Sequence, residues 1–143
     1  MEPESDAGTT ESAPEGPASG APPAVNADIF DPLQLEDSFG AFDETAAGFV
    51  TDFVETLGER ITALEAAMQA ENYQEARDIA HAMKGAANSV GAKRMGGIMA
   101  DIQDSLDEDD DMTAGLFVDL LAETYDELKN VALPFCQYYL GTG

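Results

Sequence analysis

Apolar side chains recur at steps of three and four residues along most of this chain, from Ile29 onward. This period places them on one face of an α-helix, whereas a half-buried strand alternates apolar and polar residues. No segment of the chain alternates convincingly. The sequence therefore predicts an all-α protein, an antiparallel four-helix bundle with a short leading helix.

Local signals predict where these helices begin and end. The run from Asp31 to Gln34 starts the short helix with a capping acid and a proline at the first helical position, and Gly40 ends it. A long helix follows over about 43–70, and Asn72 begins the next one as a capping box that Gly91 closes. The inward stripe predicted for the long helix is Phe49, Phe53, Leu57, Ile61, Leu64 and Met68.

Two more helices complete the predicted bundle. The first runs from about 92 to 106 and turns Met95, Ile98, Met99, Ile102 and Leu106 inward. The second is a single long helix from about Met112, in which Pro134 should produce a kink or an end. Its predicted stripe is Leu116, Phe117, Leu120, Leu121, Tyr125, Leu128 and Val131.

The first 27 residues differ in composition from the rest. They hold all but two of the prolines, five acids and one large aliphatic residue, Val25. Such a segment buries too little apolar surface to offset its ordering entropy. The sequence therefore predicts a disordered tail over 1–27 and one bundle domain over 28–143.

Charge and hydropathy exclude several classes of partner. The formal net charge of −23 opposes binding to nucleic acid and to anionic membranes. No stretch approaches the roughly 18 apolar residues of a membrane-spanning helix, and the first residues lack the basic start of a secretory signal. We expect a cytoplasmic protein whose single cysteine, Cys136, is a small buried hydrophobe.

The single histidine, His81, lies on a predicted helix whose apolar stripe faces elsewhere. That stripe comprises Ala76, Ile79, Ala80, Met83, Ala86, Ala87 and Val90. At about 100° per residue, His81 points some 160° away from Met83 and hence toward solvent. Lys84 and Gly85 follow one turn later on the same face. Lys84, Lys93 and Arg94 are half of the basic residues and lie within 14 positions of His81, so an anion could be tolerated here.

Other kinds of site fit poorly. The acidic run 107–111 lacks the spacing, glycine and closing glutamate of an EF-hand loop. His81 and Cys136 are too few strong ligands for zinc, and Ser89 is about two turns from the histidine, too far for a nucleophile pair. The chain therefore shows no complete active site of its own, and we expect neither an enzyme nor a bound cofactor.

An exposed neutral imidazole is nevertheless a nucleophile that can take up a phosphoryl group. Lys84 would supply charge neutralisation, and Gly85 would leave room for a partner's active site. A fixed tautomer needs an acceptor on the other ring nitrogen, for which Gln103 is the candidate.

The stretch from His81 to Ala92 resembles the signature of histidine-containing phosphotransfer (HPt) domains. That pattern is histidine, any residue, Leu, Met or Ile, then Lys-Gly, two small residues, and a hydrophobic residue before glycine; the matching residues are Met83, Lys84, Gly85, Ala86, Ala87, Val90 and Gly91. In family members a glutamine 22 positions after the histidine hydrogen-bonds the ring, and here that position is Gln103. The resemblance implies that His81 carries phosphate on Nε2, that Lys84 neutralises it, that Gln103 orients Nδ1 and that Gly85 permits docking.

The resemblance also implies a phosphorelay carrier acting as a monomer. Its partners would be receiver domains of response regulators and a hybrid sensor histidine kinase, and Mg²⁺ would belong to the receiver domain. The residues expected to contact these partners are Arg77, Ala82, Asn88, Leu33 and Phe39, with Val90 as a further candidate. Two alternatives stay open: a phosphorylatable module of a larger chemotaxis-type kinase, and a degenerate bundle that only binds other proteins.

Overall fold

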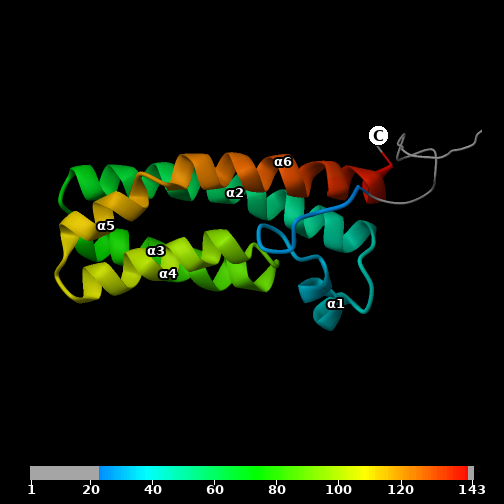
Figure 1. Cartoon of the computed structure of the whole chain (residues 1–143), viewed down its shortest axis with the longest axis horizontal. Helices are drawn as coiled ribbons and strands as arrows, with labels where there is room; N and C mark the ends of the chain where they lie inside the picture. The colour runs from blue at the N-terminus through cyan, green and yellow to red at the C-terminus, as the bar shows by residue number, and fades with distance from the viewer. Residues whose placement is uncertain (1–22, 142–143) are drawn as a thin grey trace, which may run out of the picture.

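Helix α2 (Glu44–Gln69) is the longest element, and α3 (Tyr73–Ser89), α4 (Lys93–Asp107) and α6 (Leu121–Leu140) complete a bundle with it. The computed structural model describes residues 23–141, leaving out the side chains of 37–39, and this range holds six α-helices and no strand. The two short helices, α1 (Leu33–Phe39) and α5 (Asp111–Val118), lie at opposite ends of the bundle (Figure 1). The predicted all-α fold, a four-helix bundle with a short leading helix, is confirmed.

Side chains cap α2 and α3, and Asn72 does so where the sequence predicts a cap. Asp43 accepts a hydrogen bond from the Ala46 N–H at 3.1 Å, and Asn72 accepts one from the Glu75 N–H at 3.3 Å. The Oδ1 of Asp31 accepts from the Leu33 N–H at 3.1 Å and so begins α1. These bonds satisfy backbone donors that the first turn of a helix leaves unpaired.

Gly91 joins α3 to α4 in a turn that only glycine fits. Its φ of +82° lies in the left-handed region. A Cβ here would also stand 2.2 Å from the Asp31 carbonyl oxygen. That close approach lets the Asp31 N–H donate to the Gly91 carbonyl at 2.8 Å. The segment before α1 is thereby fixed against the end of the α3–α4 pair.

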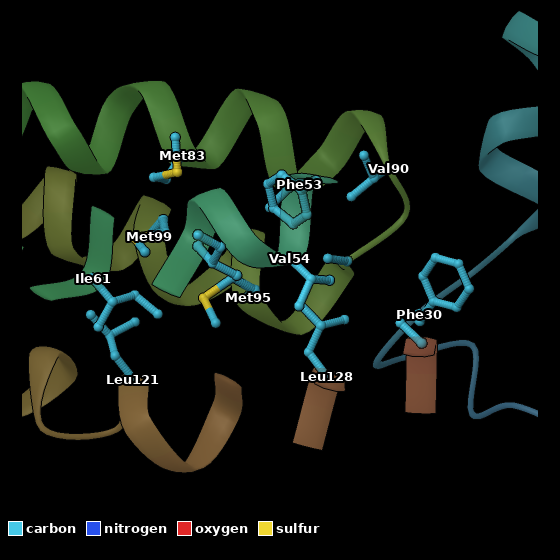
Figure 2. Close-up of a cluster of buried hydrophobic side chains, with 14 of the residues drawn as sticks. Phe30, Phe53, Val54, Ile61, Met83, Val90, Met95, Met99, Leu121 and Leu128 are labelled. Atoms are coloured by element: carbon cyan, nitrogen blue, oxygen red, sulfur yellow. The ribbon is translucent and has the colours of Figure 1, made fainter. Parts of the chain in front are cut away.

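The core lies between the four long helices. Figure 2 shows Ile61 of α2, Met99 of α4 and Leu121 of α6 converging on its centre. Phe30 closes one end of this core and packs edge-on against Phe135, with ring centroids 5.8 Å apart. Fully buried large side chains, with less than 2% exposure, are Phe30, Leu35, Leu57, Leu64, Met95, Met99, Ile102, Leu121, Leu128, Val50, Val54 and Val90.

The predicted single helix from Met112 is wrong. The chain forms α5 and α6 there, separated by a turn at residues 119–120. α5 packs mainly on α4 and α6 mainly on α2, so the chain must change direction between them. Leu116 and Leu120, predicted to face inward, are 64% and 45% exposed because Ala114 and Val118 provide the buried face of α5.

Phe49 is a second exception to the predicted stripes. It is 48% exposed, whereas its neighbour Val50 is buried. The buried set of α2 includes Ala47, Val50, Val54, Leu57, Ile61 and Leu64, which repeats at alternating steps of three and four. Phe49 lies at the edge of that face and not within it.

Three predictions about the chain's ends and interior have different outcomes. α6 does not end at Pro134 but continues to Leu140. Cys136 is buried as expected, and burial raises the pKa of its thiol to about 11. Most of the predicted disordered tail 1–27 lies outside the described residues, although Val25 packs half-buried against the core.

No helix in the described part of the chain is long and apolar enough to cross a membrane.

Candidate functional site

Helix α3 holds His81 on its solvent side. The helix buries Ala76, Ile79, Ala80, Met83 and Ala87 on the opposite side, as the sequence predicts. His81 is exposed about midway along α3, more than two turns from the Asn72 cap. The backbone beneath the ring is thus continuous helix packed on a core.

Gln103 of α4 contacts the His81 ring. Its Oε1 lies 3.2 Å from Nδ1, and its side chain is buried at 7% exposure. The amide oxygen can only accept, so this contact is a hydrogen bond in the tautomer that carries its hydrogen on Nδ1. Nε2 is then the nitrogen with the lone pair, and it belongs to the exposed ring.

Small residues bring α3 and α4 close enough for this contact. Gly96 of α4 lies under Asn88 of α3, where a Cβ would stand 2.3 Å from the Asn88 Oδ1. Ala80 and Ala87 are fully buried on α3. The small side chains shorten the distance between the two backbones, so the glutamine can reach the imidazole while staying buried.

Lys84 and Gly85 follow His81 by one helical turn. Lys84 is half-buried, not exposed as expected, and it has no ion pair among residues 23–141. Gly85 is exposed, and a Cβ there would meet nothing within 4 Å. The space around the ring on this side is therefore open.

Ion pairs engage the other cations near His81. Arg77 pairs with Asp107, and this hydrogen bond and charge raise the pKa of the Arg77 guanidinium. Lys93 Nζ lies 3.1 Å from Asp31 Oδ2, and Arg94 Nη1 lies 2.9 Å from Glu127 Oε1. Of the basic residues that the sequence places near His81, Lys84 is the one without an ion pair among residues 23–141, so its charge is available to an anion.

An apolar groove between α2 and α3 is a feature that sequence reasoning missed. It has a volume of about 320 Å³ and is lined by Phe49, Asp52, Phe53, Thr56, Met83 and Ala86. At about 100° per residue, Met83 and Ala86 point some 160° and 140° away from His81, so the groove lies on the α2 side of helix α3 and not beside the ring. The signal that could have found it is the position of Phe49, one residue out of step with the buried repeat.

The predicted docking residues are not all on one surface. Ala82 and Asn88 are exposed on α3 beside His81, while Arg77 is half-buried and paired with Asp107. Leu33 is 65% exposed on α1, and the side chain of Phe39 lies outside the described residues. Val90 cannot dock a partner, because it is 2% exposed and belongs to the core.

Acidic side chains gather around 107–111 without forming a metal site. Within residues 23–141, no three or more His, Cys, Asp or Glu side chains are placed to hold a metal ion. Asp110 instead caps α5 by accepting from the Thr113 N–H at 3.1 Å, and Asp111 accepts from the Tyr73 hydroxyl at 3.2 Å.

Comparison with known proteins identifies the family. The family model described as Hpt domain matches residues 48–131, which include His81, Lys84 and Gln103 and make up more than half of the chain. Neither a curated protein nor a solved structure matches the chain. The match spans the bundle from the first turns of α2 to the middle of α6. The chain therefore belongs to the Hpt domain family, the phosphotransfer carriers of phosphorelays.

Proposed function

We propose that this chain is a phosphorelay carrier that accepts a phosphoryl group on His81 from a receiver-domain aspartate and passes it to another receiver domain. The observation that carries the proposal is the 3.2 Å contact between Nδ1 of the exposed ring and the buried Gln103 Oε1. Water can satisfy both nitrogens of an exposed imidazole, so the ring does not need a buried protein acceptor for its solvation alone.

The proposed reaction is a single displacement at phosphorus. The Nε2 lone pair attacks the phosphorus of an aspartyl phosphate, the N–P bond forms, and the P–O bond to the aspartate breaks. The aspartate leaves as a carboxylate. Nδ1 keeps its hydrogen and its hydrogen bond to Gln103. The imidazole therefore loses no proton during the step and needs no group to accept one.

Lys84 and Gly85 have different proposed roles in this step. The Lys84 ammonium has no competing ion pair among the described residues, so it is available to neutralise phosphoryl oxygens as their charge develops. Gly85 leaves the approach to Nε2 open for the partner's active site. The Mg²⁺ that phosphoryl transfer requires would come with the receiver domain, and this chain would act without a cofactor of its own.

The exposed face of α3 around His81 is the proposed contact for the receiver domain. Ala82 is exposed next to His81 and contributes apolar surface, and Asn88 is exposed two turns along α3 on the histidine side of the helix. Apolar anchors that surround a polar reaction centre exclude water from it. The partners in this proposal are receiver domains and a hybrid sensor histidine kinase, met by a monomer in the cytoplasm.

The test is transfer from a phosphorylated receiver domain to the purified chain. We expect acid-labile, alkali-stable label on the wild-type protein and none on His81→Gln, with unchanged circular dichroism. Equal label on both proteins would contradict His81 as the acceptor, and no label across a panel of receiver domains would favour a scaffold that only binds. Labelling by a kinase's ATP-binding domain, but by no receiver domain, would instead favour a module of a chemotaxis-type kinase.

A further inference from the structure

Helix α5 carries an apolar stripe that the core does not use. Met112, Leu116 and Leu120 are 79%, 64% and 45% exposed. Met112 and Leu116 are four residues apart and lie along one side of α5, and Leu120 follows them in the turn at residues 119–120. The buried residues of α5 are Ala114 and Val118, on its other side. The stripe therefore faces solvent, at the end of the bundle opposite α1 (Figure 1).

An open hollow of about 470 Å³ lies next to this stripe. Its lining comes from the end of α2, the start of α3, and α5, and comprises Glu65, Met68, Gln69, Tyr73, Asp111, Gly115, Val118 and Asp119. Asp111, Gly115 and Asp119 each precede a stripe residue by one position. At about 100° per residue, the hollow and the stripe are therefore neighbours around the helix. We call the stripe and the hollow together the α5 surface.

Acidic residues line the hollow, at Glu65, Asp111 and Asp119, and are frequent in the segment that carries the stripe. Residues 107–123 contain seven Asp or Glu and no Lys or Arg. Asp107 is paired with Arg77, and the Asp111 carboxylate accepts from the Tyr73 hydroxyl. Asp119 and Glu123 have no ion pair within residues 23–141. The apolar stripe is thus bordered by carboxylates whose charge nothing in the described part of the chain offsets.

Charge selects among the possible occupants of this surface. If a second copy of the chain bound here, the seven acids of its 107–123 segment would face the seven of the first copy. Like-charge repulsion would oppose this dimer. Residues 1–22 of the chain carry five acids and no basic residue, so they are disfavoured for the same reason. A segment with an apolar face and flanking Lys or Arg residues would complement both parts of the surface, because a basic side chain can enter the hollow while apolar residues cover the stripe.

We infer that the α5 surface binds a basic amphipathic helix of a partner protein, at a site separate from the phosphotransfer face. Tyr73, at the hollow, and His81 are eight residues apart on α3, or about 12 Å along the helix axis. A partner held at α5 would leave His81 accessible. The surface could then tether one protein while another exchanges phosphate.

The test measures binding of a synthetic helical peptide with leucines on one face and lysines along both edges of that face. The full-length chain is titrated with it, and affinity and amide chemical shifts are recorded at low and high salt. We expect shifts confined to α5 and the hollow, and affinity that falls with salt. Leu116→Ser should weaken binding about tenfold, the loss of one apolar anchor worth roughly 1.4 kcal/mol.

A matched control separates this surface from the general acidity of the chain. Leu33 is 65% exposed, as Leu116 is 64% exposed, and it lies at the other end of the bundle. We expect Leu33→Ser to leave the affinity unchanged, and a peptide with the same composition but scattered leucines to bind more weakly. Equal effects of the two substitutions, or equal binding of the two peptides, would overturn the inference. Leu116-dependent dimerisation in sedimentation would also overturn it, in favour of a second copy.

Discussion

The face around His81 and the α5 surface are two exposed regions of one bundle with opposite construction. At His81, a buried glutamine contacts the ring, two helices meet over glycine and alanine, and a nearby lysine has no ion pair among residues 23–141. At α5, eight residues present apolar side chains among carboxylates and are anchored by two buried residues. The comparison teaches that the proposed reaction site has a rigid support, whereas the proposed docking surface offers shape and charge.

The two regions also differ in how far the rest of the fold supports them. Helix α3 packs against both α2 and α4, so its conformation follows from the core. An eight-residue helix has little stability of its own in water. The order of α5 therefore depends on its cap, on its few buried residues and on its contact with α4.

The largest effect that separates the two regions should come from Gly85→Leu. In a helix, a side chain leans back over the preceding turn, so a leucine at position 85 would cover His81. We expect phosphotransfer to fall about 100-fold, the size of loss that misplacing a reacting group produces. Peptide binding at α5 should not change.

Thermal unfolding supplies the control for this substitution. A Cβ at position 85 meets nothing, and leucine has a higher helix propensity than glycine, so the melting temperature should stay or rise. Gly97→Leu makes the same change on α4, at an exposed and equally open position, and should leave transfer intact. Normal transfer in Gly85→Leu would contradict the clearance role of the glycine.

The site helix could be predicted from sequence because its signals are local. Asn72 caps it, Gly91 closes it at positive φ, and its apolar residues keep one phase throughout. That phase places His81 outside. Gln103, 22 residues after His81, lies next to the histidine because a short turn makes α3 and α4 antiparallel neighbours.

The α5 region could not be predicted, because periodicity reports an apolar face but not what covers it. Leu116 and Leu120 continue the spacing of three and four, yet no neighbouring helix reaches them. The ion pairs were equally hidden, since Lys93 pairs with Asp31 across 62 positions of sequence. Such partners depend on how the helices meet, so the sequence names Lys84 but does not show that it differs from the other cations near His81 in having no ion pair among residues 23–141.

A smaller effect on the His81 face should follow from Gln103→Leu. The substitution removes the acceptor for Nδ1–H while nearly keeping the side-chain volume, so transfer should fall about tenfold, equivalent to roughly 1.4 kcal/mol in the barrier. Imidazole ¹⁵N shifts should show a single tautomer in the wild type and a mixture in the variant. Gln74→Leu, an exposed position on α3, is the control and should alter neither measurement. An unchanged tautomer in Gln103→Leu would show that the glutamine does not orient the ring.

The smallest effect concerns the caps of the two helices and appears only in acid. Asn72, which caps α3, does not titrate, whereas hydrogen bonds from the Thr113 side chain and backbone lower the pKa of Asp110, the cap of α5, below its ordinary 3.8. A carboxylate with a lowered pKa in the folded state stabilises the fold above its unfolded pKa. That contribution is lost as the pH falls through the folded-state value.

Hydrogen exchange across this range measures the difference. We expect amide protection in α5 to fall below about pH 4, while protection in α3 changes less. Asp110→Asn keeps a good capping residue but removes the titration, so it should reduce the extra acid sensitivity of α5. If α3 and α5 instead lose protection in parallel in both proteins, α5 is held by the core as firmly as the histidine helix. The contrast between a rigid reaction site and a loosely held docking helix would then be wrong.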